Sequence, residues 1–353
     1  MKKKVLLGMS GGVDSSVAAI LLKNAGYDVT GVTMHLYEGG CCNLSSTLDA
    51  KIICKKLGIP HVILDYKEEF SDIVMKDFIN EYKNARTPNP CIICNKYFKF
   101  GLMYEKAKKL GIDYIATGHY AKCEFDEKYN QYVIKKADNI KKDQSYFLYN
   151  IKREVLDKLL FPLGTFKSKD EVRQIAKDND FRVYSKPDSE DVCFIPNGNY
   201  KKFLEENSDI KPKEGNIVNS KSEILGKHTG LYNYTIGQRK GLGVSYSEPL
   251  YVIGFNILKN EVIVGTEKEL LKDDILVKDY NLLLMDDLNE TMDVTVKTRY
   301  SKSEAEATIS KKIIDGKNYI YLKFKEPQMR ITPGQSAVFY IGDTVLGGGI
   351  IES

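Results

Sequence analysis

The segment Ser10-Gly11-Gly12-Val13-Asp14-Ser15-Ser16 restricts the fold of this 353-residue chain more than any other feature. An apolar run at residues 4–9 precedes it and predicts a buried strand, and the apolar spacing of residues 12–25 predicts a helix. Glycines let a backbone approach a bound group closely, and a helix N-terminus offers free N–H groups to an anion. The segment therefore predicts a phosphate-binding loop in an α/β domain.

The polar side chains of this loop indicate a nucleotide bound together with a cation. Ser10, Ser15 and Ser16 are candidate hydroxyl donors to phosphates. Asp14 would repel phosphates unless a divalent cation lay between them, which indicates Mg²⁺. The segment lacks the Lys-Ser/Thr pair of a P-loop and the glycine spacing of the dinucleotide fingerprint, so neither of those sites is expected.

Strands and helices alternate through about the first 120 residues. The predicted strands are 4–9, 29–34, 62–64 and 114–117, and the predicted helices are 12–25, 46–57, 68–82 and 96–110. Strands that alternate with helices of this length predict a parallel, doubly wound sheet.

After residue 120 the pattern changes. Residues 122–125 and 132–136 alternate with a period of two and predict an antiparallel hairpin. Helices are predicted at 151–160 and at 168–179, and the second opens with Ser168 and Glu171 as a capping box. Short predicted strands then follow, at 251–257, 261–264, 294–298, 305–309, 319–324 and 336–341. Their spacing predicts small β-barrel modules.

The cysteines indicate chemistry and not a disulfide framework, because the seven are odd in number and clustered. Cys91 and Cys94 form a Cys-x-x-Cys in a proline-rich loop before the predicted helix, whose N-terminus favours a thiolate. With Cys193 they are candidate metal ligands or sulfur nucleophiles. Cys54, on a helix, and Cys123, in the hairpin, are interpreted as small buried apolar residues.

Two further cysteines stay open. Cys41 and Cys42 follow the second predicted strand, on the edge of the sheet where ligands bind, and either supply extra ligands or lie near the site. Zinc is an alternative for Cys91 and Cys94, but zinc prefers four ligands, and the sequence has no second Cys-x-x-Cys and no paired histidines.

Charge and hydropathy place the chain in the cytoplasm. No apolar run approaches the ~18 residues that span a bilayer, and the N-terminus does not resemble a signal peptide, so no membrane partner is expected. The net charge is only +4, which allows nucleic acid without demanding it. The basic pairs are candidate phosphate contacts or simply a solvated surface: Lys135-Lys136, Lys141-Lys142, Lys201-Lys202 and Arg239-Lys240.

Seven motifs, in order along nearly the whole chain, resemble the tRNA-specific 2-thiouridylase family of the pyrophosphatase-loop ATPase superfamily. They are residues 10–16, Arg86-Thr87-Pro88-Asn89-Pro90, Ala116-Thr117-Gly118-His119-Tyr120, Lys142-Asp143-Gln144-Ser145-Tyr146-Phe147-Leu148, Gly237-Gln238-Arg239-Lys240-Gly241-Leu242-Gly243, Lys297-Thr298-Arg299-Tyr300 and Thr332-Pro333-Gly334-Gln335. The resemblance implies an ATP-pyrophosphatase catalytic domain at 1–204, a small central β-rich domain at 205–272 and a C-terminal β-barrel at 273–353.

The resemblance also implies an activity. ATP would adenylate the C2 oxygen of a wobble uridine, and sulfur would then replace that oxygen as AMP leaves. The implied partners are the anticodon stem-loop of tRNA and a sulfur donor, either a protein or sulfide. A wobble base must leave its stack to reach such a site. Another pyrophosphatase-loop enzyme, such as a different tRNA thiolase or an amidating ligase, and a non-enzymatic nucleic-acid-binding protein are the alternatives.

The motifs carry roles over to residues of this chain. ATP would be bound by Gly8, Met9, Ser10, Gly11, Gly12, Val13, Asp14, Ser15, Ser16, Met34 and Gly118. The target base would face Asn89, Pro90 and Cys91, with Cys94 as nucleophile and Cys193 as persulfide carrier. The tRNA contacts would be His119, Lys142, Asp143, Gln144, Arg299, Tyr300 and Gln335.

One departure from the family changes the sulfur chemistry that we expect. Well-known members carry aspartate where this chain has Cys91, and related thiolation enzymes hold a 4Fe-4S cluster through three cysteines. We therefore place a cluster on Cys91, Cys94 and Cys193 first, because three soft ligands are present. The alternative is a persulfide on Cys193 and closure of a Cys94–Cys193 disulfide.

Overall fold

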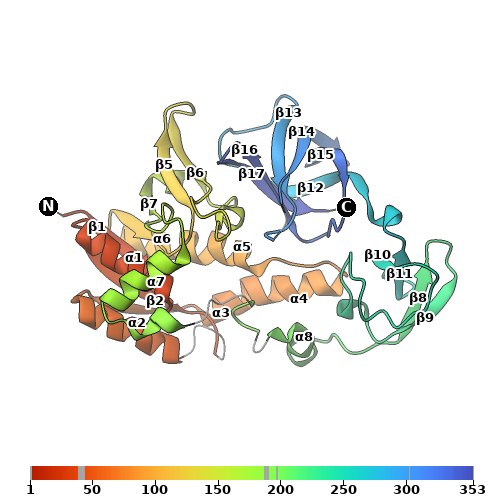
Figure 1. Ribbon diagram of the computed structural model, residues 1–353, viewed down its shortest axis with the longest axis horizontal. Helices are drawn as coiled ribbons and strands as arrows, with labels where there is room; N and C mark the ends of the chain where they lie inside the picture. Colours follow the sequence, from red (N-terminus) through yellow and green to blue (C-terminus); the bar gives the residue numbers. More distant parts are fainter. Residues whose placement is uncertain (1, 39–43, 187–190, 196–197, 302, 353) are drawn as a thin grey trace. The chain divides into compact units, whose positions relative to one another are not determined.

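The computed structural model describes residues 2–38, 44–186, 191–195, 198–301 and 303–352 (Figure 1). The chain divides into two compact units. Unit 1 comprises Met1–Met75, Pro90–Gly198 and Ile341–Leu346, and unit 2 comprises Lys76–Asn89, Asn199–Tyr340 and Gly347–Ser353. The chain therefore passes from unit 2 into unit 1 between Asn89 and Pro90.

A five-stranded parallel sheet forms the centre of unit 1, as the alternation of strands and helices predicts. Its order is β3 (His61–Asp65), β2 (Asp28–His35), β1 (Lys4–Gly8), β4 (Tyr114–Ala116) and β7 (Leu159–Leu160). The chain builds outward from β1 to β3 and then returns to add β4 on the other side of β1. The loops after β1 and β4 consequently meet at a topological switch point, where ligands bind in such sheets.

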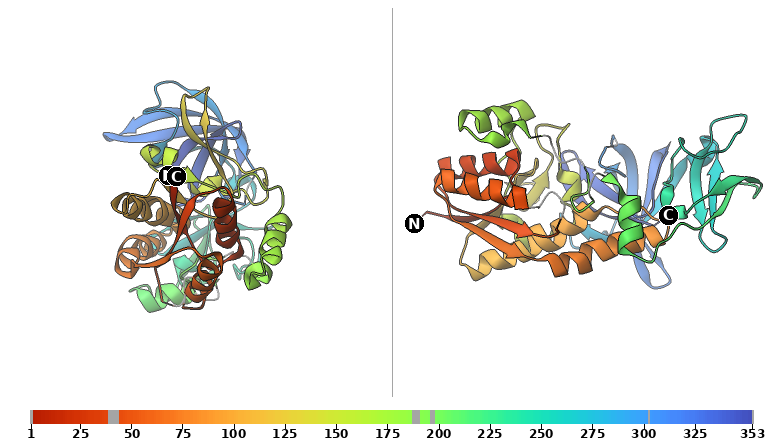
Figure 2. Two further views of the ribbon diagram at one scale, coloured as in Figure 1. Left: turned by 90° about the vertical axis from the view of Figure 1, so that its left-hand side faces the viewer. Right: turned by 90° about the horizontal axis from the view of Figure 1, so that it is seen from below.

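Helices cover both faces of this sheet (Figures 1 and 2). The helices α1 (Val13–Asn24), α2 (Leu44–Leu57) and α7 (Lys169–Asp178) share one apolar core with Val5 and Leu7 of β1. Side chains alternate along a strand, so Gly8 faces the other side, where a Cβ would lie 3.6 Å from Met103 Sδ of α6 (Met103–Lys109). The predicted cap of α7 is confirmed, because Ser168 Oγ accepts a hydrogen bond from Glu171 N.

The helix that carries the cysteines starts earlier than predicted. The segments α5 (Pro90–Cys94), η2 (Asn95–Leu102, π-helical) and α6 follow one another directly. The expectation of a loop over Cys91 and Cys94 is therefore wrong. Proline is favourable in the first turn of a helix, where its missing N–H costs nothing, and Pro90 occupies that turn.

A second prediction is also wrong. In place of a helix at 151–160, the chain forms a short 3₁₀ segment, η4 (Arg153–Lys158), and then β7. Leu159 and Leu160 pair in parallel with Ile115 and Ala116 at the sheet edge. Tertiary pairing at this edge overrides the local helical pattern.

The remaining parts of unit 1 follow the predictions. The antiparallel hairpin is present as β5 (Lys122–Asp126) and β6 (Gln131–Lys135). The helix predicted at 68–82 appears as α3 (Lys67–Phe70), the π-helical η1 (Ser71–Met75) and α4 (Lys76–Lys83), of which α4 belongs to unit 2. The short segments η3 (Ser145–Phe147) and η5 (Arg182–Ser185) complete unit 1.

The first part of unit 2 is a small sheet with a helix before it. The helix α8 (Tyr200–Asn207) lies against α4, where Tyr200 stacks on Tyr82 with ring centroids 5.0 Å apart. The sheet has the order β10 (Tyr251–Asn256), β11 (Glu261–Gly265), β8 (Gly215–Asn219) and β9 (Ile224–His228). β8 and β9 were not predicted, since their polar residues hide the alternating pattern.

A closed six-stranded barrel ends unit 2, as expected from the spacing of the strands. Its order is β12 (Lys272–Leu282), β15 (Lys317–Gln328), β14 (Ala305–Ile314), β13 (Met292–Lys297), β16 (Ser336–Ile341) and β17 (Thr344–Ile351). β12 pairs with both β15 and β17 and so closes the barrel. Among the described residues, no helix is both long and apolar enough to cross a membrane.

Candidate active site

The phosphate loop lies at the switch point, between β1 and α1. Gly11 has a φ of +71°, and a Cβ on it would lie 2.1 Å from the carbonyl oxygen of Ser46, so only glycine fits there. Gly12 is the N-cap of α1 with extended backbone and makes no side-chain cap. The first turn of α1 therefore offers its N–H groups and the positive end of its dipole to an anion.

The serines mainly shape this loop. Ser16 is fully buried, and its Oγ donates to Gly12 O at 2.7 Å. Ser15 Oγ lies 3.2 Å from both Gly12 O and Ser10 Oγ. The expectation of three hydroxyl donors to phosphate is therefore corrected: Ser16 is used inside α1, and Ser10 is the exposed hydroxyl.

Asp14 has cationic and hydroxyl partners that sequence reasoning missed. Lys169 Nζ, at the start of α7, lies 2.6 Å from both carboxylate oxygens of Asp14, and Tyr120 Oη donates to Oδ1 at 2.7 Å. Lys186 Nζ pairs with Asp49 and lies 3.4 Å from Gly11 O. The negative charge of Asp14 is thus balanced by an ammonium group, and two lysines lie beside the phosphate loop.

Gly118 and Met34 join the phosphate loop from neighbouring strands. A Cβ on Gly118, just after β4, would lie 2.8 Å from Ser15 N and 2.9 Å from the carbonyl carbon of Asp14. Met34 is buried near the end of β2, and β2 pairs with β1 on the side opposite to β4. The structure therefore places the residues expected to bind ATP on the carboxyl ends of three adjacent strands.

His119 is buried instead of being presented to solvent. Its Nδ1 lies 2.7 Å from Thr117 Oγ1, and the ring is packed against Phe100 and Phe161. Burial, helped by the charge of Lys99, holds the pKa of His119 well below its usual value, so the ring is neutral. With only 8% of its surface exposed, His119 offers little to a tRNA.

The segment that contains Lys142, Asp143 and Gln144 is also largely structural. Asp143 is buried and accepts hydrogen bonds from Ala137 N and from the N and Oγ of Ser145. Gln144 Oε1 accepts from Tyr120 N, and Gln144 N donates to Tyr120 O at 2.7 Å. Gln144 thus ties the segment to Tyr120, which in turn contacts Asp14, while Asp143 ties it to Ala137. Lys142 is partly exposed and keeps its place as a tRNA-contact candidate.

Cys91 and Cys94 lie on one short helix with different exposure. Cys91 is exposed and Cys94 is buried, and Cys193 is half-buried. The next residue, Asn95, donates from Nδ2 to Phe147 O at 3.0 Å and ties this helix to the 142–148 segment. In the part of the chain that the structure describes, no three His, Cys, Asp or Glu side chains gather closely enough to hold a metal ion.

Two of the sequence expectations lie outside the described residues. Cys41 and Cys42 belong to the undescribed segment 39–43, and residues 187–190 and 196–197 flank Cys193 on both sides.

The expected tRNA contacts of unit 2 differ in their availability. Arg299 Nη2 donates to Ile236 O at 3.2 Å and to Thr332 Oγ1. Tyr300 is exposed. Gln335 Nε2 donates to Thr87 O and Pro88 O, at 3.0 and 3.1 Å, so its amide is engaged within the protein.

Comparison with known proteins gives the same succession of domains. Family models match residues 3–197 (tRNA methyl transferase HUP domain), 201–266 (tRNA methyl transferase PRC-barrel domain) and 272–351 (aminomethyltransferase beta-barrel domain). The chain is 48% identical to tRNA-specific 2-thiouridylase MnmA of Clostridioides difficile strain 630, covering 100% of this chain and 99% of the relative. The chain belongs to the tRNA-specific 2-thiouridylase family.

Other relatives support this assignment over the full length. The chain is 47% identical to tRNA-specific 2-thiouridylase MnmA 1 of Clostridium botulinum strain Loch Maree, with 100% of both chains covered. It is also 47% identical to tRNA-specific 2-thiouridylase MnmA of Acetivibrio thermocellus, with 99% of both covered. The family resemblance inferred from the seven motifs is thereby confirmed.

Two cysteines of this 2-thiouridylase family member have thiols with raised pKa values, although only Cys54 is buried as predicted and Cys123 is half-buried. Cys54 is buried in α2, and burial raises the pKa of its thiol to about 11. Burial, with the charges of Glu124 and Asp157, raises the pKa of Cys123 to about 12, and its Sγ donates to Leu156 O. Neither thiol is suited to act as a nucleophile.

This difference predicts a pattern of alkylation. With iodoacetamide at about pH 8, we expect Cys91 to be modified in the native protein, because it is exposed. Cys54 should react about 100-fold more slowly in the native protein than in the urea-unfolded chain, since its thiolate is scarce and covered. Peptide mass spectrometry of both samples, with the half-buried Cys123 as a second thiol of raised pKa, measures the ratio. Equal rates in the native and unfolded chains would contradict the burial.

A half-buried carboxyl in α4, that of Asp77, predicts a pH dependence of the free energy of unfolding. Burial raises the pKa of Asp77 to about 6, and the charge of Glu81 adds to this while Arg86 opposes it. The folded state therefore binds this proton more tightly than the unfolded chain, whose aspartate titrates near pH 3.9. Protonation of Asp77 therefore adds to the free energy of unfolding as the pH falls below about 6, and this contribution is absent above about pH 6.

We accordingly expect Asp77→Asn to raise the free energy of unfolding at about pH 8 by about 1–3 kcal/mol and to change it little at about pH 4. Urea unfolding of both proteins at the two pH values measures this. Asp315→Asn, in an exposed turn, is the matched control. A stability gain of the same size at both pH values would show that the proton linkage assigned to Asp77 is wrong.

Proposed function

We propose that this protein is a tRNA-uridine 2-sulfurtransferase that adenylates the C2 oxygen of a wobble uridine and replaces that oxygen by sulfur. The observation that carries the proposal is the uncapped phosphate loop at the switch point, with Gly118 packed on it, in a chain of this family. The cysteine helix begins at Pro90, directly after Asn89, and the resemblance places both residues against the target base. Thiols so close to the expected base position support sulfur as the incoming atom.

The first step consumes ATP. The C2 oxygen of uridine attacks the α-phosphorus, the bond between the α- and β-phosphates breaks, and pyrophosphate leaves. The N–H groups at the start of α1 would hold the leaving phosphates, and Lys169 and Lys186 supply positive charge beside them. Such interactions stabilise charge that develops as the bond breaks.

Magnesium fits this site through few protein ligands. Mg²⁺ usually keeps several waters and binds one or two carboxylates together with substrate phosphates. Asp14 is the carboxylate that would hold it, in exchange for its contact with Lys169. When bound, the ion neutralises phosphate charge, while Lys169 and the first turn of α1 orient the nucleotide.

The second step transfers sulfur, and we write it for the persulfide route, with Cys193 as the carrier and Cys94 as the nucleophile. The terminal sulfur of a Cys193 persulfide attacks C2 and expels AMP, which leaves a disulfide link between uridine and Cys193. The Cys94 thiolate then attacks the sulfur of Cys193, which releases 2-thiouridine and forms a Cys94–Cys193 disulfide. A thiol reductant must reopen this disulfide, and a donor protein that carries a persulfide must transfer its outer sulfur to the Cys193 thiolate.

The other route holds a 4Fe-4S cluster on Cys91, Cys94 and Cys193 as three soft ligands. Purification without oxygen, followed by iron and sulfide analysis, separates the two routes. Iron-free protein that is fully active with a persulfide donor supports the persulfide route. Activity that scales with bound iron would support the cluster route.

The function itself is tested with an unmodified tRNA transcript, ATP, Mg²⁺ and a persulfide donor. Nucleoside mass spectrometry should detect 2-thiouridine at the wobble position, and a transcript with cytidine at that position is the control. A second pyrophosphatase-loop chemistry would be favoured if ATP were cleaved and the wobble uridine stayed unchanged.

A further inference from the structure

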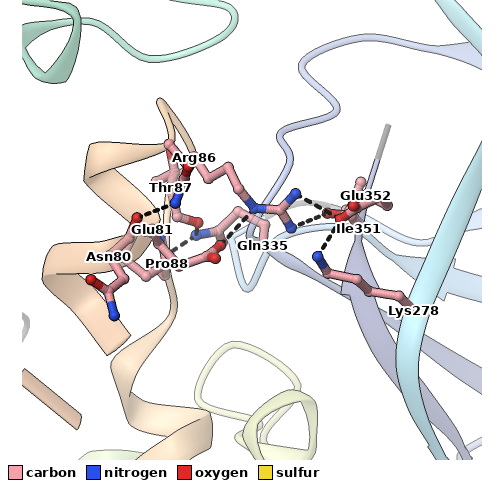
Figure 3. Close-up of polar contacts among 10 residues, drawn as sticks. Asn80, Glu81, Arg86, Thr87, Pro88, Lys278, Gln335, Ile351 and Glu352 are labelled. Atoms are coloured by element: carbon pink, nitrogen blue, oxygen red, sulfur yellow. Dashed lines mark hydrogen bonds and ion pairs between the residues drawn. The ribbon is translucent and has the colours of Figure 1, made fainter. Parts of the chain in front are cut away.

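The segment before the cysteine helix belongs to unit 2 and is held there by a cluster of charged side chains (Figure 3). We call these side chains the Arg86 cluster; its members are Glu81, Arg86, Lys278 and Glu352. Arg86 Nε donates to Glu81 Oε2 at 2.8 Å, Nη1 to Glu352 Oε2 at 2.7 Å and Nη2 to Ile351 O at 3.0 Å. Lys278 Nζ is 2.6 Å from Glu352 Oε2.

The cluster joins α4 to the end of the C-terminal barrel. Glu81 lies on α4, Lys278 on β12, and Glu352 directly after β17. Burial pushes the pKa of Glu352 up, but the hydrogen bonds from Lys278 and Arg86 outweigh it and leave the pKa lowered, so the carboxylate stays charged. Removal of one partner would leave a charge in a partly buried position without compensation.

The backbone of the segment is held by one turn of the barrel. Thr87 N donates to Pro333 O at 2.9 Å, and Gln335 Nε2 donates to Thr87 O and Pro88 O. Gly334 has a φ of +90°, and a Cβ there would lie between 2.7 and 2.9 Å from Glu81 Oε2 and the N and O atoms of Thr87. The turn is therefore pressed against residue 87, and only glycine allows this approach.

Directional polar contacts hold this arrangement beside a cavity. A cavity of about 590 Å³ lies beside the cluster and is lined by Glu81, Arg86, Lys278 and Glu352, among other residues of unit 2. The position of the segment depends on the guanidinium and amide hydrogen bonds, whose geometry is directional.

The same turn is linked to the expected tRNA contacts of the barrel. Arg299 Nη2 donates to Thr332 Oγ1, and Thr332 begins the turn that holds Thr87 and Pro88. An unbroken set of contacts within unit 2 thus leads from Arg299 through the turn to Pro88. The next residue, Asn89, is the last of this part of unit 2, and Pro90 begins the cysteine helix.

We propose that the Arg86 cluster and Gln335 are positioning residues. They fix residues 86–89 to the barrel, so that a tRNA bound by the barrel presents its base in register with the cysteine helix. This inference rests on the proposed function. In this proposal Gln335 acts on the segment that faces the base and does not bind tRNA directly, whereas the resemblance implies that Gln335 contacts tRNA. The stiff Pro88 and Pro90 would pass a displacement of the segment on to Cys91 and Cys94.

The test separates binding from catalysis. For Gln335→Ala we expect single-turnover thiolation at saturating tRNA to fall about 10–100-fold, as small misplacements of reacting groups do. The Kd for tRNA should stay within about twofold, because phosphate contacts dominate that affinity. Gln328→Ala is the matched control, since Gln328 bonds to Glu326 O within its own strand. We expect Glu352→Gln, which keeps an acceptor for Arg86, to be less impaired than Glu352→Ala.

The outcomes decide the proposal in both directions. A slower rate with unchanged Kd supports it, and a raised Kd for Gln335→Ala, or an unchanged rate, overturns it. If a variant does not fold, hydrogen exchange of the wild-type protein remains: the Thr87 amide should be protected, and exchange as fast as in an open loop overturns the proposal. If wild-type protein makes no 2-thiouridine, the proposed function has failed, and that result is distinct from an effect confined to the variants.

Discussion

Replacement of Cys94 by serine should abolish formation of 2-thiouridine, with a loss of about 10³-fold or more in turnover, as expected for removal of a nucleophile. Cys94 is buried on α5, so the isosteric change should leave the fold intact. The first step does not use this thiol, and tRNA-dependent release of pyrophosphate should therefore persist. Nucleoside mass spectrometry and a pyrophosphate assay on the same sample measure the two steps separately.

Cys193→Ser and Cys91→Ser complete this experiment. In the persulfide route, Cys193→Ser is as inactive as Cys94→Ser, whereas Cys91→Ser keeps activity within about tenfold of the wild-type protein, because Cys91 does not react. Equal loss in all three variants, together with loss of iron, would support the cluster. Retention of thiolation by Cys94→Ser would refute the role that we give to Cys94.

The second large effect is expected at Gly118. A methyl group there would meet Ser15 N at 2.8 Å and the carbonyl carbon of Asp14 at 2.9 Å, both of which are backbone atoms that cannot rotate away. Gly118→Ala should therefore displace the phosphate loop and weaken ATP binding about 100-fold, since the loop must place its N–H groups on the phosphates. Titration with ATP, followed by calorimetry, measures the change.

The matched control for Gly118→Ala is Gly254→Ala in β10. A Cβ on Gly254 meets only Ile263 Cδ1, at 3.9 Å, so the added methyl group has space and ATP binding should be unchanged. Thermal unfolding of both variants shows whether the loss at Gly118 is local. Unaltered ATP affinity in a well-folded Gly118→Ala protein would contradict the placement of ATP on this loop.

Much of the fold can be predicted from local patterns. Strands and helices alternate through the first 120 residues, and glycines at 26 and 58 end two of the helices in the left-handed conformation expected for them. The predictions failed where distant partners decide. The pattern of residues 151–160 is helical, yet Leu159 and Leu160 pair with β4, and the polar β8 and β9 form only against each other and β11.

The residues of the candidate site likewise fall into those that local motifs predict and those that only the tertiary structure reveals. The motifs single out the phosphate loop, Gly118 and the cysteines, because glycine freedom and thiol chemistry are properties of the residues themselves. Lys169 has no distinguishing neighbours in the sequence, and it reaches Asp14 only because α7 packs on α1. Conversely, His119 and Asp143 have polar side chains suited to binding RNA, but both are buried and stabilise the fold instead.

The sequence by itself determined that this chain has a strand–loop–helix phosphate site, thiols beside a proline-stiffened segment, and the motifs of a 2-thiouridylase, since each depends on residue types at short spacing. The tertiary structure decided which charges face these groups. Lys169 lies 155 residues from Asp14, and Glu352 lies 266 residues from Arg86. Contacts over such separations arise from the packing of whole elements, and no local pattern encodes which side chains then meet.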